Sequence, residues 1–350
     1  MSKPRVVVAG LGDSGLLTAV HLARARQVGE VVGISAKTAL VSGQELGVRL
    51  ARPDDWARDY LIGFDRFRGL DGVRTVHAGL LGLDSAARTV TVEDADGSTH
   101  AEPYDVLVIA TGVTNGFWRR ADVQSPAEVE TELRAAHERL GSAGAIGIVG
   151  GGAAAVSSAL NLALAWPDAS VDLYFPGERA LPHHHGRVWR QVQRRLSEAG
   201  VSLHAEHRAV VPEGFGCDAI TAGPIAWSTG QPPAEADAVL WAIGRVRPNS
   251  GWLPSELLDE NGFVRVDPQL RVPGAPGVWA VGDIAATDPL RTSARNRADK
   301  LLAHNIRATV SDRELKDYEP PRRRWGSVLG VQPDGLEVFA ANGRAFRFPA

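Results

Sequence analysis

Two glycine-rich segments of the sequence have the residue types and spacing that bind phosphate. The first is GLGDSG, residues 10–15, which lies between a short apolar run and a segment with helical apolar periodicity. In such a unit Gly10 permits a tight turn, Gly12 lets the backbone approach a pyrophosphate, and Gly15 lets helix and strand pack closely. The helix N-terminus stabilises the phosphate charge, and Ser14 is a further candidate contact. The segment predicts a dinucleotide site.

A second segment of the same kind follows 140 residues later. It is GGGAAA, residues 150–155, and it again stands between a strand-like and a helical pattern. Gly150 and Gly152 occupy the positions of the turn and of the close approach, while Ala155 takes the third position, where only packing is required. Two fingerprints in the right context are far more specific than one. Together they predict two bound dinucleotides.

The acidic residue that usually accepts hydrogen bonds from the adenosine ribose is missing from both units. Ser35 follows the second strand-like run of the first unit, with Lys37 close behind, and we keep both as candidate cofactor contacts. In the second unit the corresponding position is Phe175, with Glu178 and Arg179 a turn later. A serine hydroxyl can bond a ribose, but more weakly than a carboxylate does.

Thiol and metal chemistry have little support. Cys217 is the only cysteine, so neither an intramolecular disulfide nor a CxxC redox pair can form. We interpret it as a small, partly buried apolar residue. Residues 183–185 are three consecutive histidines beside Pro182, and such neighbours do not readily converge on one ion, so no metal site is predicted.

Charge and hydropathy narrow the possible partners and location. The formal net charge is -3, which gives no bulk attraction toward nucleic acid or anionic lipid. No apolar run reaches the roughly 18 residues of a membrane-spanning helix, and the run after Arg5 ends at Gly10, far short of a secretory signal. We expect a cytoplasmic protein with no nucleic-acid partner; peripheral membrane contact and a homodimer stay open.

The elements that position these residues follow an α/β pattern, in which short apolar runs alternate with amphipathic segments. Residues 73–110 differ, because their short strand-like runs are separated by turns such as Asp96-Gly97. A basic, proline-rich linker at 320–324 leads to a C-terminal segment of strands and turns at 326–348. The predicted strands of the α/β units are 5–9, 31–34, 106–109, 145–149 and 171–175, and the predicted helices are 16–23, 127–140, 154–164 and 187–199.

Three further segments give the sequence a family resemblance. They are YDVLVIATG at 104–112, AVLWAIG at 238–244 followed by Pro248 and Asn249, and GVWAVGD at 277–283. In order and spacing the chain resembles pyridine nucleotide-disulfide oxidoreductase-like flavoproteins over residues 5–306. Because it lacks their cysteine pair, it is most similar to the branch of type II NADH dehydrogenases and apoptosis-inducing-factor-like reductases.

The resemblance implies particular contacts with FAD. Gly282 and Asp283 would meet its ribityl and phosphate part, and Thr111 and Gly112 would cover the flavin domain where the chain crosses over. A helix starting near Ser293 and running to Ile306 would point its positive end at the flavin. Such a dipole favours the anionic reduced flavin by about 0.3 to 2 kcal/mol.

The resemblance also places residues around the nicotinamide and the acceptor. Gly244 would be a further cofactor contact, whereas Ser157 stands where the family usually has an acid near the nicotinamide. Trp189, Trp241 and Trp279 lie in apolar patterns that indicate core. The weaker candidates for the flavin and acceptor region are Ser42, Gln44, Glu45, Trp118 and Trp325.

These observations predict two Rossmann-like domains and an NAD(P)H oxidoreductase. The FAD domain would comprise residues 1–114 and 250–307, the NAD(P)H domain 115–249, and a small C-terminal segment 308–350. A hydride would pass from nicotinamide C4 to flavin N5, and electrons would then reach a quinone-like or other small acceptor without a catalytic side chain that we can name. The alternatives are a flavin monooxygenase or oxidase that uses oxygen, and a non-catalytic redox sensor that binds FAD and NADH.

Overall fold

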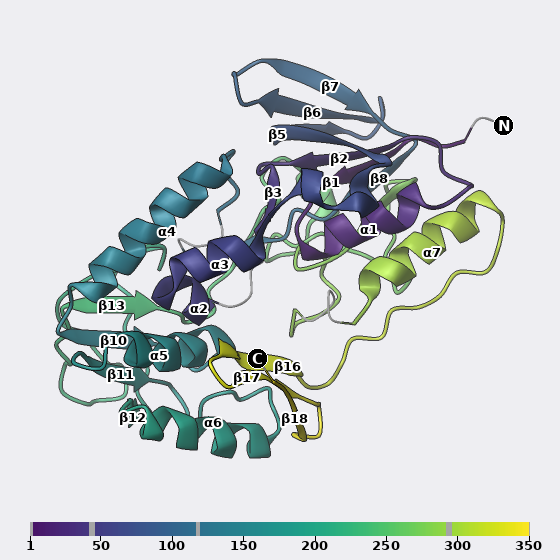
Figure 1. Ribbon diagram of the computed structural model, residues 1–350. Helices are drawn as coiled ribbons and strands as arrows, with labels where there is room; N and C mark the ends of the chain where they lie inside the picture. Colours follow the sequence, from purple (N-terminus) through teal and green to yellow (C-terminus); the bar gives the residue numbers. More distant parts are fainter. Residues whose placement is uncertain (1–2, 42–45, 117–119, 292–295, 350) are drawn as a thin grey trace.

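The computed structural model describes residues 3–41, 46–116, 120–291 and 296–349, and two main sheets organise it (Figure 1). The larger sheet has seven strands in the order β15-β8-β1-β2-β5-β6-β7. The five strands from β15 to β5 run parallel, and β6 and β7 continue the sheet antiparallel. The strands are β1 (Val6–Ala9), β2 (Val31–Ser35), β5 (Val73–Asp84), β6 (Thr89–Asp94), β7 (Thr99–Pro103), β8 (Val106–Ile109) and β15 (Val278–Ala280).

Strands β1, β8 and β15 are apolar throughout because both faces of this part of the sheet are covered. Val6 and Val8 face a cluster shared with α1 (Asp13–Ala23) and α7 (Ala298–Val310). Val7 and Ala9 face the opposite cluster, to which Trp252 and Leu253 belong. The α/β prediction is confirmed. Within residues 73–110, β5 has 12 residues and is longer than the short strands expected there.

Helix α7 differs from the prediction at its start. It begins at Ala298 and not near Ser293, which lies outside the described residues. The residue before it, Arg297, has φ 60°, in the left-handed region that an L-residue in a right-handed helix does not adopt. The helix therefore cannot extend through Arg297 toward the N-terminus.

The smaller sheet repeats the first architecture with four parallel strands in the order β12-β11-β10-β13. A capping box between Ser125 and Glu128 starts the helix that leads into it. The strands are β10 (Ala145–Val149), β11 (Ser170–Tyr174), β12 (Ser202–His204) and β13 (Ala238–Trp241). The helices are α4 (Pro126–Gly141), α5 (Ala153–Ala165) and α6 (Gly186–Glu198).

Smaller elements connect and complete the two halves (Figure 1). Antiparallel β9 (Val113–Thr114) and β14 (Arg247–Pro248) form the double connection between them. Among the described residues, no helix is long and apolar enough to cross a membrane. The remaining elements are β3 (Ala39–Val41), β4 (Leu61–Gly63), α2 (Leu46–Ala51), α3 (Pro53–Tyr60) and the 3₁₀ turns Phe64–Arg66, Arg68–Leu70 and Ser255–Leu257.

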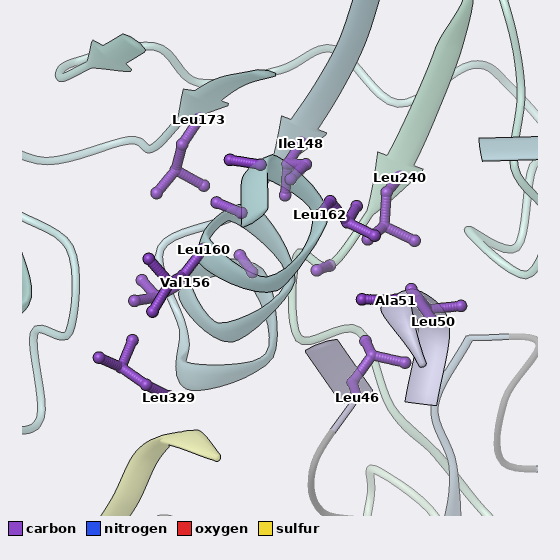
Figure 2. Close-up of a cluster of buried hydrophobic side chains, with 14 of the residues drawn as sticks. Leu46, Leu50, Ala51, Ile148, Val156, Leu160, Leu162, Leu173, Leu240 and Leu329 are labelled. Atoms are coloured by element: carbon purple, nitrogen blue, oxygen red, sulfur yellow. The ribbon is translucent and has the colours of Figure 1, made fainter. Parts of the chain in front are cut away.

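A C-terminal antiparallel sheet packs against helices α5 and α2. Its strands are β16 (Gly326–Gln332), β17 (Gly335–Phe339) and β18 (Ala345–Phe348). Figure 2 shows Leu329 of β16 on one side of α5 and Leu46, Leu50 and Ala51 of α2 on another. Helix α5 thus packs against two segments, α2 and β16, that are far apart in the sequence.

Candidate functional site

One cavity of about 1260 Å³ connects the two halves and is lined by both fingerprints. The predicted site residues on its wall are Gly10, Gly12, Ser14, Ser35, Lys37, Thr111, Gly112, Gly152, Gly244, Gly282 and Asp283. The other three, Gly15, Gly150 and Ala155, lie behind the wall. The structure therefore brings residues that are up to 273 positions apart in the sequence (Gly10 and Asp283) to the same space.

The glycines of the first fingerprint meet three different demands. Gly10 has φ 101°, and a Cβ there would lie 2.5 Å from the carbonyl oxygen of Ala110. A Cβ on Gly15 would lie 1.9 Å from the carbonyl oxygen of Gly10, so helix α1 can approach β1 only without a side chain at this position. Gly12 caps α1, and a Cβ on it would meet no protein atom within 4 Å. The space in front of Gly12 is open to the cavity.

The second fingerprint repeats this geometry. Gly150 has φ 144°, and a Cβ there would lie 2.2 Å from the carbonyl oxygen of Ala242. Gly152 caps α5 and, like Gly12, faces open space. Ala155 is fully buried, so the third position does accommodate a methyl group. Each half thus presents the N-terminus of a helix to the cavity across a residue without a side chain, which suits a pyrophosphate.

Ser35 and Lys37, the two candidate cofactor contacts at the end of β2, have different roles. The hydroxyl of Ser35 accepts a hydrogen bond from the backbone N–H of Lys37 at 3.2 Å, and Ser35 lines the cavity. The ammonium of Lys37 donates to the backbone carbonyls of Arg120, at 3.1 Å, and Asp122. Burial lowers the pKa of Lys37. Lys37 therefore ties the segment before α4 to the larger sheet, while Ser35 is the side chain that can reach a ribose.

At the end of β11 the aromatic residue belongs to the core. Phe175 is only 2% exposed and packs edge-on against Trp189, with ring centroids 5.5 Å apart. Basic side chains reach the cavity beside it, namely Arg179 and Arg208. Ser157 lines the cavity, but its hydroxyl donates to the carbonyl of Leu329 at 3.3 Å. Phe175 is thus part of the core, and Ser157 links α5 to β16.

Asn249 holds the connection between the halves, a role that the sequence did not reveal. Its side-chain amide donates to the carbonyl of Thr111 at 3.0 Å, and its side-chain oxygen accepts from the hydroxyl of Thr114 at 2.7 Å. The hydroxyl of Thr111 donates to the backbone carbonyl of Asn249 at 2.9 Å. Asn249 follows the motif at residues 238–244, but the motif does not show which residues Asn249 contacts.

Arg49 of α2 is a second residue missed by sequence reasoning. It is 3% exposed, lines the cavity, and places its guanidinium 4.3 Å from the centre of the Trp56 ring. A stacked guanidinium of this kind is stabilised by the ring quadrupole. The signal that could have revealed Arg49 is a charge inside the otherwise apolar run LGVRLA, residues 46–51.

The remaining candidates lie away from the cavity or outside the described residues. Cys217 is 4% exposed, and burial raises the pKa of its thiol, which agrees with its interpretation as an apolar residue. His185 caps α6 by accepting from the N–H of Arg187 at 3.2 Å. Trp189, Trp241 and Trp279 are buried as predicted, and Trp325 is half-buried outside the cavity wall. Ser42, Gln44, Glu45 and Trp118 are outside the described residues.

Comparison with known proteins identifies the family. Residues 4–304 match the pyridine nucleotide-disulphide oxidoreductase family, and the chain belongs to it. It is accordingly an FAD-dependent NAD(P)H oxidoreductase. Since the sequence has one cysteine, it lacks the disulfide in the family name.

Individual relatives and solved structures match the chain at low identity. Oxidoreductase ptaL of Pestalotiopsis fici is 26% identical over 298 residues, which are 82% of this chain and 74% of that protein. Reduced CoADR-RHD of Bacillus anthracis superposes with a TM-score of 0.72 at 18% identity, covering 97% of this chain but 61% of that one. Ferredoxin reductase for the CYP199A2 system of Rhodopseudomonas palustris has a TM-score of 0.67 at 21% identity, over 90% of this chain and 78% of that one.

Proposed function

We propose that the chain binds FAD at the first fingerprint and NAD(P)H at the second, and reduces a small, quinone-like acceptor. The observation that carries this proposal is the shared cavity, because Gly12 and Gly152 both open onto it. FAD, when bound, accepts a hydride from the nicotinamide and passes electrons to the acceptor. The chain's own task is to bind both dinucleotides and to set their distance and orientation.

On the FAD side the residues fit a split site. The N-terminus of α1 at Gly12 would hold the pyrophosphate, and Asp283 would accept hydrogen bonds from ribityl hydroxyls. Gly282 brings the segment after β15 against α1, since a Cβ on Gly282 would lie 3.2 Å from the Ser14 side chain. Residues that follow the first strand of the larger sheet and residues that follow its last strand in the sequence thus enclose the same part of the cavity.

On the NAD(P)H side the N-terminus of helix α5 provides a partial positive charge. Helix α5 begins after Gly152 with no acidic residue in its first turn, so its positive end faces the cavity without a competing carboxylate. Thr111, Gly112 and Asn249 lie on the cavity wall where the chain crosses between the halves. Their hydrogen bonds would fix how the two dinucleotides meet.

The wall near α2 supports a quinone-like acceptor. The apolar residues Ala39, Val41 and Leu46 line this wall, and Arg49 adds a buried positive charge. An apolar surface beside a cation suits a flat molecule whose carbonyl oxygens gain negative charge on reduction. With only one cysteine no dithiol relay can exist, and Cys217 does not line the cavity, so the acceptor would be reduced directly at the flavin.

A matched pair of variants tests the assignment of the two sites. Gly12 and Gly152 both have negative φ, −73° and −89°, and both face open space, so valine at either position leaves the backbone unstrained. Gly12→Val should lose FAD. Gly152→Val should keep FAD and its reduction by dithionite, but flavin reduction by NAD(P)H should slow at least tenfold, measured by stopped-flow absorbance.

Three results would contradict the proposal. If Gly152→Val is folded and flavin-loaded and still reacts with NAD(P)H at the wild-type rate, the nicotinamide binds elsewhere. If the reduced wild-type flavin is reoxidised by air much faster than by a soluble quinone, an oxidase or monooxygenase replaces the quinone reductase. If neither reoxidises it quickly, the redox sensor is favoured.

A further inference from the structure

The second fingerprint lies beside a concentration of arginines that the proposed function does not yet use. Arg179, Arg208 and Arg324 line the cavity. Partial desolvation, followed by the charges of Arg323, Arg187, Arg190 and Arg179, lowers the pKa of His185. Four guanidinium groups are therefore close enough to one imidazole to disfavour its protonation. Together with Arg208 and Arg324 they form what we call the arginine cluster.

The cluster is assembled from four separate segments. Arg179 lies after β11, Arg187 and Arg190 in the first turns of α6, Arg208 after β12, and Arg323 and Arg324 in the linker before β16. The backbone N–H of Arg324 donates to the carbonyl of His183 at 3.0 Å, which fixes the end of the linker against the loop after β11.

Backbone contacts also fix the cluster relative to the fingerprint. The N–H of Leu181 donates to the carbonyl of Gly151 at 2.7 Å. The guanidinium of Arg179 donates to the carbonyls of Pro182 and His184 at 3.3 to 3.4 Å, which holds it against the same loop. The loop that carries Arg179 thus lies directly on the segment that would hold the pyrophosphate.

Acidic residues are missing where an NADH site would need one. The position after β11 is the buried Phe175, and its neighbours Glu178 and Glu206 are exposed and lie off the cavity wall. The acids that line the described cavity are Asp13, Glu132 and Asp283, from α1, α4 and the segment after β15. A carboxylate after this strand bonds the ribose 2′-hydroxyl of NAD, whereas arginine accommodates the 2′-phosphate of NADP.

We propose that the second site prefers NADPH to NADH, and that Arg179 and Arg208 bind the phosphate on its adenosine 2′ position. This inference rests on the proposed function, which places the nicotinamide coenzyme at that site. A phosphate monoester carries a charge of about −1.5 to −2 at neutral pH and forms strong, geometrically specific bonds with guanidinium groups. The remaining arginines of the cluster raise the local positive potential and attract the coenzyme.

Binding of nucleotide fragments tests the phosphate site without any turnover. We expect calorimetry on the FAD-loaded protein to show 2′,5′-ADP binding at least tenfold more tightly than 5′-AMP, with inorganic phosphate far weaker than either. Arg179→Ala and Arg208→Ala should each weaken 2′,5′-ADP by about tenfold and leave 5′-AMP within about twofold. Arg194→Ala is the matched control, because Arg194 is on α6, its side chain is 80% exposed, and it pairs with Glu198 at 3.2 Å.

Stopped-flow reduction separates this inference from the proposed function. NADPH should reduce the flavin with a lower apparent Kd than NADH, and the double variant Arg179→Ala, Arg208→Ala should remove that difference. Reduction by NADH with equal or greater affinity, or equal binding of 2′,5′-ADP and 5′-AMP, overturns the NADPH preference while the reductase function stands. Failure of both coenzymes to reduce the flavin overturns the reductase function itself.

Discussion

At the scale of single residues, burial determines what the thiol of Cys217 can do. Cys217 packs in an apolar cluster with Val149, Tyr174 and Trp241, on the face of the smaller sheet opposite α5. Burial raises the pKa of the thiol, so it stays protonated at neutral pH. A neutral, enclosed thiol is neither a nucleophile nor an electron relay.

Replacing this thiol should therefore leave catalysis unchanged. Cys217→Ser is expected to keep NAD(P)H-dependent reduction of a soluble quinone within about twofold per bound flavin, because no dithiol relay exists. The variant should lose about 1 to 3 kcal/mol of stability, since a hydroxyl is buried in an apolar cluster. Cys217→Ala controls for that cost. A large loss of turnover in both folded, flavin-loaded variants would show that the thiol takes part in the reaction.

At the scale of elements, an ion cluster attaches the antiparallel edge of the larger sheet. The carboxylate of Glu102, on β7, lies 2.6 Å from guanidinium nitrogens of both Arg5 and Arg74, and His100 is at 3.3 Å. Burial alone would raise the pKa of Glu102, but the hydrogen bond from Arg74 and the charges of Arg74 and Arg5 together lower it. The charged carboxylate thus links β7 to β5 and to the residue before β1.

This cluster predicts a pH-dependent contribution to stability. The pKa of Glu102 is lower in the folded chain than its ordinary value of about 4.3. Its stabilisation is therefore complete above that value and is lost as the pH falls through the folded pKa. Glu102→Gln should lower the free energy of unfolding by about 1 to 3 kcal/mol at pH 7, and by progressively less under acid.

Chemical denaturation at several pH values measures this effect. Glu93→Gln is the control, since Glu93 is exposed on the neighbouring strand β6 and should change stability by less than about 0.5 kcal/mol at any pH. A loss in Glu102→Gln that is the same at pH 7 and at pH 3 would mean that packing, and not charge, explains it.

The elements that the sequence predicted well are those with strong periodicity or a glycine motif. Strand β10 begins at Ala145 and ends at Val149 as expected, and the fingerprints at Gly10 and Gly150 stand between strand and helix. Local signals suffice there because each βα unit is made of neighbouring residues. The start of α7 was wrong because the left-handed conformation of Arg297 has no sequence signature.

The contacts that the sequence could not predict join distant segments. Asn249 bonds Thr111 and Thr114 across more than 130 residues, and the backbone N–H of Arg324 in the linker bonds the carbonyl of His183. The hydrophobic periodicity of a sequence does not indicate contacts between residues that are so far apart. The sequence also could not show that Phe175 belongs to the core, because an aromatic residue at this position could equally have faced the cavity.

At the scale of the whole molecule, one core unites segments that the predicted domain boundaries separate. The largest apolar cluster contains Leu50 and Trp56 from the first predicted FAD segment, Leu160 from α5, and Leu329 and Phe339 from the C-terminal sheet. The nucleotide half is therefore completed by residues from before and after it in the sequence. Its stability should depend on the C-terminal sheet, although that sheet lies outside both Rossmann units.

Two phenylalanines of the C-terminal sheet test this dependence. Phe339 is fully buried in the shared core, whereas Phe346, on the adjacent strand, is 45% exposed. Phe339→Ala should cost about 3 to 5 kcal/mol and lower Tm by about 10 °C, because it leaves a cavity in the shared core. Phe346→Ala should change stability by less than about 0.5 kcal/mol.

Hydrogen exchange shows which half responds. In Phe339→Ala we expect faster amide exchange in β10 and α5 than in β1 and α1, because the lost contacts lie on the core of the smaller sheet. Flavin should be retained under conditions in which reduction by NADPH already declines. If exchange accelerates equally in both halves, the molecule unfolds as one cooperative unit, and the C-terminal sheet does not support the nucleotide half selectively.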